Sequence, residues 1–236
     1  MKVAAIVAAA GKGERMKAKA HKAFVLLGKE PILAHTLKAL DASNTVSEII
    51  VVVHQSDLPK ARLLVKKGKF KKVKDVVAGG KRRMDSVKSG LAAVSEDAEY
   101  VIVHDGCRPF IDNRMISSVV GAADTFGAAI TGMPVKPTIK QVEKGNFVAA
   151  TLDRETLVEV QTPQAFRKDI LLRAYDRAFA HDAAAEPGAV PAAATDDAVL
   201  AERLGIKVKV VDGSYGNIKI TTPEDLKYAK TLAGLK

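Results

Sequence analysis

Residues 3–16 read VAAIVAAAGKGERM, an unbroken apolar run that ends in a glycine-rich, basic segment. A run of small and β-branched residues is typical of a strand that is buried on both faces of a parallel sheet. Gly11 and Gly13 end the run, and because glycine has no Cβ, backbone N–H groups there can turn toward a ligand. Lys12 and Arg15 add positive charge. The stretch therefore predicts a strand followed by a phosphate-binding loop.

The spacing within this loop differs from the two commonest phosphate motifs. The dinucleotide fingerprint G-x-G-x-x-G would need glycine where Met16 stands, and no G-K-[ST] triplet follows to make a P-loop. The pattern A-A-A-G-x-G-x-R-M, with Lys22 following, resembles the signature of nucleotide-sugar-type nucleotidyltransferases. A tight turn would explain Gly-x-Gly alone equally well, but Arg15 and Lys22 in register favour phosphate binding.

Length and composition predict one globular domain over residues 1–236. The single cysteine, Cys107, leaves no internal disulfide and suits a reducing compartment. No apolar run approaches the roughly 18 residues of a membrane span, and the N-terminus lacks the pattern of a signal peptide. We therefore expect a cytoplasmic protein with no membrane partner.

The formal net charge of +10 permits two interpretations. A basic face is the electrostatic footprint of nucleic-acid binding. The alternative is a solvated basic surface with a few cations gathered for a small anionic substrate. Aromatic residues make up only 5% of the chain and tryptophan is absent, so platforms for stacking bases are scarce. We therefore expect no nucleic-acid partner.

Apolar runs alternate with segments of helical spacing, which predicts an α/β fold with a doubly wound, mostly parallel sheet, similar to a Rossmann fold. Ligands bind such sheets outside the carboxyl ends of the strands. An alanine-rich segment at 182–194 predicts a mobile surface loop, and Thr195 a cap for the helix that follows. The expected strands are 3–9, 48–54, 73–77, 100–104, 128–135, 208–211 and 217–220, and the expected helices 31–40, 58–65, 85–94, 115–126, 170–179, 196–204 and one from 222.

The pattern changes at approximately 134–157. Two short strands, 138–142 and 147–152, flank a turn at Gly145-Asn146, which predicts a β-hairpin that projects from the domain. Such an arm must cover its apolar face, and pairing with a second subunit is one way to do so. A homodimer through this arm is therefore expected, although the hairpin could also fold back on its own domain.

Polar residues cluster where the predicted strands end. Cations that converge there from several strands suit a substrate with several phosphates. The candidate residues also have simpler interpretations. Lys219 could lie on the solvent-exposed face of an edge strand, Asp105 could be a turn residue and Thr162 a loop residue. Cys107 could simply fill space in the core. Arg83 opposes the dipole of a helix start and needs an anion to justify it. Asp85, Asp196 and Asp197 are interpreted as helix caps rather than metal ligands.

An ordered set of motifs covers nearly the whole chain. The motifs are Ala9–Met16, Lys22-Ala23-Phe24, Gly79-Gly80, Arg83–Val87, His104–Pro109, Pro134-Val135-Lys136, Thr151–Arg154, Gln161–Gln164, Thr195-Asp196-Asp197 and Asn217-Ile218-Lys219. The set resembles the family of 2-C-methyl-D-erythritol 4-phosphate cytidylyltransferases. Two features depart from the family pattern: Pro137 stands where an acidic residue is usual, and the alanine-rich segment is longer than expected.

The resemblance implies a reaction of CTP with methylerythritol phosphate, which gives CDP-methylerythritol and pyrophosphate with help from Mg²⁺ or another divalent cation. The chemistry is consistent, because a phosphate monoester is already largely dianionic and needs no general base. It implies catalytic roles for Arg15, Lys22 and Lys219. CTP-binding roles are implied for Ala9, Ala10, Gly11, Lys12, Gly13, Gly80, Arg83, Ser86 and Gly106. Roles toward the acceptor are implied for Asp105 (also the metal ligand), Arg108, Thr138, Arg154 and Thr162, with Arg154 reaching the site of the neighbouring subunit.

Two other functions remain open at the level of sequence. A ribitol-5-phosphate cytidylyltransferase would share the scaffold and differ around the acceptor pocket. A basic nucleotide- or nucleic-acid-binding module without turnover would show steeply salt-dependent binding and release no pyrophosphate.

Overall fold

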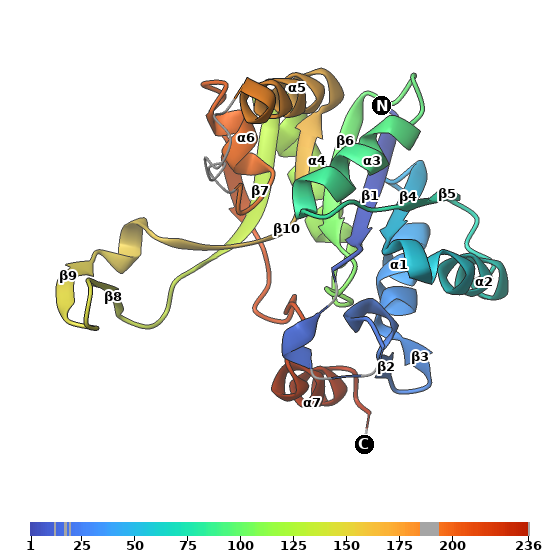
Figure 1. Cartoon of the computed structure of the whole chain (residues 1–236), viewed down its shortest axis with the longest axis horizontal. Helices are drawn as coiled ribbons and strands as arrows, with labels where there is room; N and C mark the ends of the chain where they lie inside the picture. Colours follow the sequence, from blue (N-terminus) through green and yellow to red (C-terminus); the bar gives the residue numbers. More distant parts are fainter. Residues whose placement is uncertain (12, 17, 19, 185–193, 236) are drawn as a thin grey trace.

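A seven-stranded sheet forms the centre of the molecule, with strand order β11-β7-β10-β6-β1-β4-β5 (Figure 1). The computed structural model describes residues 1–11, 13–16, 18, 20–184 and 194–235. The strands run parallel except β10, which pairs antiparallel with both β6 and β7. The prediction of an α/β, mostly parallel sheet is confirmed. Its strands are β1 (Val3–Ala9), β4 (Glu48–Val53), β5 (Val73–Ala78), β6 (Tyr100–Asp105), β7 (Ala128–Pro134), β10 (Val158–Arg167) and β11 (Lys209–Asp212).

Helices cover both faces of this sheet, because alternate side chains of each strand point to opposite sides. Ala5 and Val7 of β1 pack in one core with α1, α2, α4 and α7, and Ala4 and Ile6 pack in a second core with α3, α5 and α6. None of the helices in the described residues has both the length and the apolar character needed to span a bilayer. The helices are α1 (Ile32–Ala42), α2 (Leu58–Gly68), α3 (Arg83–Ala93), α4 (Asn113–Phe126), α5 (Lys168–Ala184), α6 (Ala198–Glu202) and α7 (Pro223–Leu232).

The order of the strands creates a crevice beside β1. From β1 the chain moves outward through β4 and β5, and α3 then carries it back to β6 on the other side of β1. Ala8 is level with Asp105 of β6, and Ala9 is level with Val53 of β4. The carboxyl ends of three strands therefore meet at the point where the strand order reverses, which is where sheets of this type bind ligands.

Strand β10 is the largest departure from the expected pattern. Its polar residues and Pro163, which cannot donate a backbone hydrogen bond, made it unlike a central strand. The structure accommodates the proline because the pairing of β10 with β7 shifts register between Val160 and Gln164. The interpretation of Thr162 as a loop residue is therefore wrong, since it lies inside a strand next to β6.

Three expectations in the C-terminal third are also corrected. Residues 217–220 do not form a strand. Helix α5 continues to Ala184, so the expected loop begins as helix, and its remainder at 185–193 lies outside the described residues. Helix α6 is shorter than the expected 196–204, and Thr195 does not cap it. Gln164 Oε1 accepts hydrogen bonds from the backbone N–H groups of Asp197 and Ala198, and Asp196 Oδ1 accepts one from Val199 N.

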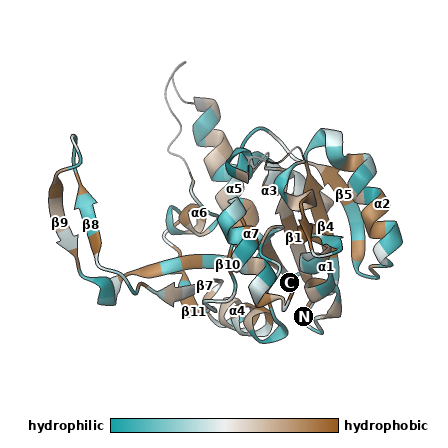
Figure 2. Cartoon of the chain, turned by 90° about the horizontal axis from the view of Figure 1, so that it is seen from below, coloured by the Kyte–Doolittle hydropathy of each residue, from teal (hydrophilic) through white to brown (hydrophobic). Residues whose placement is uncertain are grey.

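The predicted hairpin projects far from the body of the molecule (Figures 1 and 2). Strands β8 (Ile139–Val142) and β9 (Val148–Leu152) pair antiparallel, which confirms it. Gly145 and Asn146 both have positive φ, +89° and +62°, as the tight turn requires. Phe147 at the turn is 71% exposed and Val148 is 59% exposed. The arm therefore carries apolar surface that this single chain leaves uncovered.

Two helical glycines give opposite predictions for stability. A Cβ on Gly90 of α3 would lie 2.6 Å from Ile6 Cγ2 and 3.0 Å from Val52 Cγ2, so Gly90→Ala should lower the free energy of unfolding by about 1–2 kcal/mol. Gly121 of α4 has no atom within 4 Å of its Cβ position, so Gly121→Ala should raise it by about 0.5–1 kcal/mol. Urea unfolding of both variants measures this. A stabilising effect of Gly90→Ala would contradict the packing of α3 on β1, and a destabilising effect of Gly121→Ala would contradict the open space at α4.

Candidate active site

Three adjoining hollows form the crevice at the carboxyl ends of β1 and β6. The first lies over Ala9, Ala10 and Ser86, the second over Gly13, Arg15 and His54, and the third over Arg108, Gln161 and Thr162. Lys219 lines all three, Lys22 lines the first two, and Asp105 and Arg83 line the first and third. The crevice can therefore hold an elongated anionic ligand from one end to the other.

Lys22 lies on the short 3-10 helix η2 (Lys22–Phe24), which follows the glycine-rich loop and the 3-10 helix η1 (Glu14–Met16). Gly13, at φ +70°, lies so close that a Cβ there would be 2.4 Å from Lys22 Cβ, which explains the need for glycine. Burial lowers the pKa of Lys22, and the charges of Lys219 and Arg15 lower it further while Cys107 and Asp105 oppose them. A cation that is partly stripped of water beside like charges gains strongly from a bound anion.

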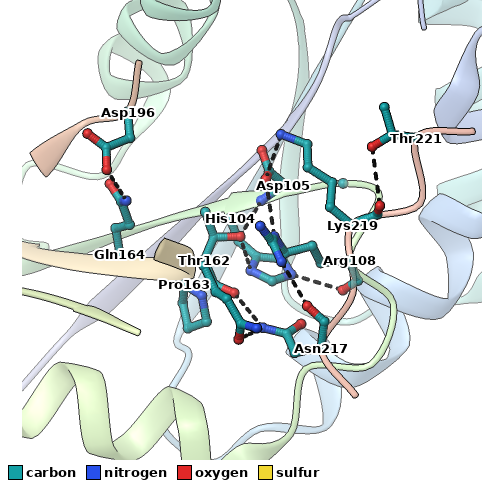
Figure 3. A network of polar contacts seen from close by, with 12 residues as sticks. His104, Asp105, Arg108, Thr162, Pro163, Gln164, Asp196, Asn217, Lys219 and Thr221 are labelled. Atoms are coloured by element: carbon teal, nitrogen blue, oxygen red, sulfur yellow. Dashed lines mark hydrogen bonds and ion pairs between the residues drawn. The ribbon is translucent and has the colours of Figure 1, made fainter. Parts of the chain in front are cut away.

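Asp105, at the end of β6, is the negative centre of the site (Figure 3). Its Oδ2 lies 2.9 Å from Lys219 Nζ and accepts a hydrogen bond of 3.3 Å from Arg108 Nε. Burial raises the pKa of this carboxyl group, but the charges of Lys219, Arg83 and Arg108 outweigh burial and hold its pKa well below the usual range. Asp105 is therefore ionised, and the interpretation as a mere turn residue is wrong.

The segment that carries Lys219 is fixed by side chains instead of a sheet ladder. Asn217 is fully buried, and its Nδ2 donates to Gln161 Oε1 and Thr162 O. Its backbone oxygen accepts from Arg108 Nη1 at 2.8 Å, and Ile220 N donates to Cys107 O. These bonds satisfy the Asn217 oxygen and the Ile220 N–H, and they fix the segment on both sides of Lys219, whose ammonium group lies against Asp105.

A buried relay joins Asp105 to β10. Asp105 N donates to Thr162 Oγ1 at 3.0 Å, so the Thr162 hydroxyl can donate its proton to His104 Nδ1 at 3.1 Å. His104 Nε2 then donates to Arg108 O. Burial lowers the pKa of His104 to about 4, so the ring is neutral at physiological pH, in agreement with this single-donor arrangement. The relay holds Asp105 and Arg108 in place.

Arg83 finds the anion that its position requires. Its Nη2 lies 2.7 Å from Asp197 Oδ2, and Asp197 also accepts a hydrogen bond from Tyr175 at 2.6 Å. The Asp197 side chain therefore does not cap α6, whereas Asp85 does cap α3 by accepting from Arg82 N. Burial opposes the charge on Arg83, but Asp197 outweighs it and raises the pKa of the guanidinium, so Arg83 stays charged at the edge of the crevice.

The structure brings most of the expected residues together. Gly106 packs against Ala9 beneath the crevice, where a Cβ would be 2.8 Å from the Ala9 Cβ. Thr138 and Arg154 lie on the arm, where Arg154 donates to Lys136 O, and they line none of the three hollows. Lys12 is outside the described residues. The residues gathered around the crevice are Ala9, Ala10, Gly11, Gly13, Arg15, Lys22, Gly80, Arg83, Ser86, Asp105, Arg108, Thr162 and Lys219.

Several residues that build the site have no role predicted from the sequence. Asn217, Gln161 and Gln164 are almost fully buried polar side chains. Only their position next to the expected site residues could have indicated this, because nothing in an amide side chain itself shows that it is buried. Cys107 is buried and its pKa is raised to about 11 by burial, which agrees with its interpretation as a filler.

A sheet of this topology, with a glycine-rich loop and several cations at its switch point, defines an enzyme of the nucleotidyltransferase class. The family model of IspD, 2-C-methyl-D-erythritol 4-phosphate cytidylyltransferase, matches residues 3–234. The chain therefore belongs to this family and is a cytidylyltransferase. The reaction of the family joins CTP to methylerythritol 4-phosphate and gives CDP-methylerythritol and pyrophosphate, in the non-mevalonate route to isoprenoids.

Individual relatives agree with this assignment. The protein of that name from Pelotomaculum thermopropionicum is 45% identical over 98% of this chain and 94% of its own length. The one from Alkaliphilus metalliredigens is 46% identical over 95% and 90%. A crystal structure of 4-diphosphocytidyl-2C-methyl-D-erythritol synthase from Anaerococcus prevotii superposes with a TM-score of 0.84 at 31% identity and covers 99% of this chain and 96% of that one. The Thermus thermophilus enzyme gives 0.76 at 32% identity, with both chains fully covered.

The buried charge of Asp105 gives a pH-dependent prediction. Because its pKa is lowered on folding, its contribution to stability is fully present above the ordinary value of about 4 and is lost as the pH falls toward the folded value. Asp105→Asn should lower the free energy of unfolding by roughly 3 kcal/mol at pH 7, and this loss should shrink below about pH 4. Denaturant unfolding at several pH values measures it.

Asp97→Asn is the control, because Asp97 forms an exposed ion pair with Lys2 and should change stability little. Equal stability of Asp105→Asn and the unmodified protein at pH 7 would show that the three cations do not need this carboxylate.

Proposed function

We propose that this chain transfers the cytidylyl group of CTP to 2-C-methyl-D-erythritol 4-phosphate through electrostatic stabilisation by Lys22, Lys219 and Arg15. The observation that supports it most directly is that Lys219 lines all three hollows of the crevice, with Lys22 on one side of it and Arg108 on the other. A residue in that position would contact the point where donor and acceptor meet.

The donor would occupy the first two hollows. Ala9, Ala10, Gly80 and Ser86 line the first, where small side chains leave room for a base and a ribose. Ser86 Oγ accepts from Gly80 N at 3.2 Å, which shapes the loop before α3 around this hollow. The triphosphate would extend into the second hollow toward Lys22 and the exposed Arg15.

The reaction needs charge compensation more than proton transfer. The attacking phosphate oxygen is already anionic at neutral pH, so the site must bring two anions together and stabilise the charge that builds on the leaving pyrophosphate. Lys219 would stabilise the α-phosphate and Lys22 the leaving group. Cations fixed in a partly buried crevice are effective because they need no reorganisation during the reaction.

A divalent cation fits the donor set around Asp105. Mg²⁺ commonly binds through one or two carboxylates together with substrate phosphates, and it would neutralise charge on the triphosphate. Asp105 is an ionised carboxylate at the junction of the first and third hollows, and its contacts to Lys219 and Arg108 both use Oδ2. Among the described residues no three His, Cys, Asp or Glu side chains gather as a complete metal site, so the substrate would have to supply ligands.

The acceptor would occupy the third hollow, between Asp105, Arg108 and Thr162. Thr138 and Arg154 lie on the projecting arm and line none of the three hollows of the crevice, so they would act in the site of a second subunit. The exposed apolar residues Phe147 and Val148 favour such a homodimer. The lone buried cysteine agrees with a cytoplasmic location.

Pyrophosphate release tests the function. CTP, Mg²⁺ and methylerythritol 4-phosphate should give release that depends on the acceptor, whereas ATP, UTP and GTP should give little. Faster release with ribitol 5-phosphate would transfer the proposal to the other cytidylyltransferase. No release with any polyol phosphate, together with salt-sensitive binding of RNA or DNA, would overturn it.

Lys22→Ala and Lys219→Ala should each lower kcat by about 10²–10³, because each removes a charge that acts mainly in the transition state. Their circular dichroism spectra should be unchanged. Lys71→Ala, at an exposed lysine outside the crevice, is the matched control and should retain the unmodified rate. Near-normal rates for both crevice variants would exclude the electrostatic mechanism.

Subunit mixing tests the arm. Arg154→Ala and Lys219→Ala should both be nearly inactive alone, because each lacks one part of a shared site. Mixing equal amounts should restore about a quarter of the activity if subunits exchange, since half of the dimers are then mixed and each has one intact site. Sedimentation of Phe147→Asp should show a shift toward monomer. Mixtures as inactive as their components, with a monomeric unmodified protein, would contradict the shared site.

A further inference from the structure

Three residues beside the second hollow form a polar contact that the proposed mechanism does not use. His21 directly precedes Lys22, and its Nδ1 hydrogen bonds with Asp57 Oδ2. The ring of His54 packs edge-on against the His21 ring, with 4.8 Å between centroids. We name His21, Asp57 and His54 the histidine clamp.

The clamp joins the Lys22 turn to a rigid part of the fold. His54 follows the last residue of β4, and Asp57 immediately precedes α2, on the short 3-10 helix η3 (Gln55–Asp57). Both residues are therefore fixed by the central sheet and the helix after it. The turn with Lys22, in contrast, follows the glycine-rich loop and has little regular structure of its own.

Asp57 is placed where its carboxylate would ordinarily cap α2. It occupies the N-cap position, but its side chain makes no capping hydrogen bond and reaches across to His21 instead. The Asp57 side chain is only 14% exposed and that of His21 is 25% exposed, so solvent screens the pair less than a surface pair. A carboxylate withdrawn from its local role indicates that the contact to His21 is the stronger requirement.

A second contact supports the same turn from the other side. Phe24, at the end of η2, is buried, and Lys60 of α2 lies over its ring at 4.5 Å from the centroid. Gly13 closes the remaining side against Lys22 itself. Lys22 is thus held between the glycine-rich loop and α2. The contact of Asp57 with the adjacent residue His21 fixes the direction of the Lys22 side chain.

We propose that the histidine clamp is a positioning device that aims Lys22 into the phosphate end of the crevice. The inference rests on the proposed function, because it takes Lys22 to be the residue that stabilises the leaving pyrophosphate. His21 and Asp57 contact no substrate in this proposal; they act through Lys22. Loss of the clamp lets the Lys22 ammonium move away, and a displacement of about 1 Å can cost up to 10²-fold in rate.

A double-mutant cycle distinguishes positioning from a general structural role. His21→Ala should lower kcat/KM for CTP by about 10–100-fold and leave KM for the acceptor unchanged. In the Lys22→Ala background the same change should have less than about a twofold effect, because the residue that it positions is gone. An equal loss in both backgrounds would overturn the proposal.

Further variants guard against misfolding. The amide of Asn occupies nearly the position of the His Nδ1 donor, so His21→Asn should recover most of the activity that His21→Ala loses. Asp57→Ala should reproduce the effect of His21→Ala. Glu30→Gln, which breaks a nearby exposed ion pair with Lys38, is the control and should be active. Failure of His21→Asn to recover activity, when its melting temperature is unchanged, would contradict the clamp.

Isothermal titration calorimetry with inorganic pyrophosphate measures the same double-mutant cycle as binding affinity, without catalytic turnover. Pyrophosphate affinity should fall with His21→Ala, but not in the Lys22→Ala background. An unmodified protein that releases no pyrophosphate from CTP would refute the proposed function alone, and the calorimetric cycle would still decide the clamp. Additive losses of affinity in that cycle would refute the clamp alone.

Discussion

The ionised carboxylate of Asp105 is the interaction on which the site depends. It is buried at the end of a central strand, where an unpaired charge would be costly, and Lys219, Arg108 and Arg83 compensate it. The same arrangement keeps three cations close together in the absence of an anionic ligand, because one negative charge offsets part of their repulsion. The Asp105 carboxylate therefore holds the three cations together, and bound phosphate would further offset the repulsion among them.

Each cation is held by its own set of polar contacts. Lys219 is aimed by the buried amide of Asn217, Arg108 by Asp105 and the Asn217 carbonyl, and Arg83 by Asp197. Buried amides and carboxylates are costly unless hydrogen bonds or opposite charges compensate them, so each of these contacts also restricts the position of its neighbours. The site is preorganised by this network more than by the helices and strands themselves.

The layered sheet and the glycine-rich loop follow from local patterns, since buried parallel strands are recognisable as continuous apolar runs. Strand β10 does not, because Pro163 and its polar neighbours contradict the ordinary pattern of a central strand and only a register shift accommodates them. The segment 217–220 is predicted to be a strand because Ile218 and Ile220 alternate with polar residues. Its hydrogen bonds instead run from the Asn217 side chain to Thr162 O of β10, from Arg108 Nη1 to Asn217 O, and from Ile220 N to Cys107 O.

The sequence by itself determined most of the alternating strands and helices, the glycine-rich loop after the first strand, the hairpin and, through its ordered motifs, the family. These depend on neighbouring residues or on spacing along the chain, which the sequence contains directly. Only the tertiary structure decided that Arg83 pairs with Asp197, that Lys219 faces Asp105, and that Asp57 reaches His21. Such contacts join residues that are far apart in the chain, and their energy depends on burial and distance, which exist only once the sheet has assembled.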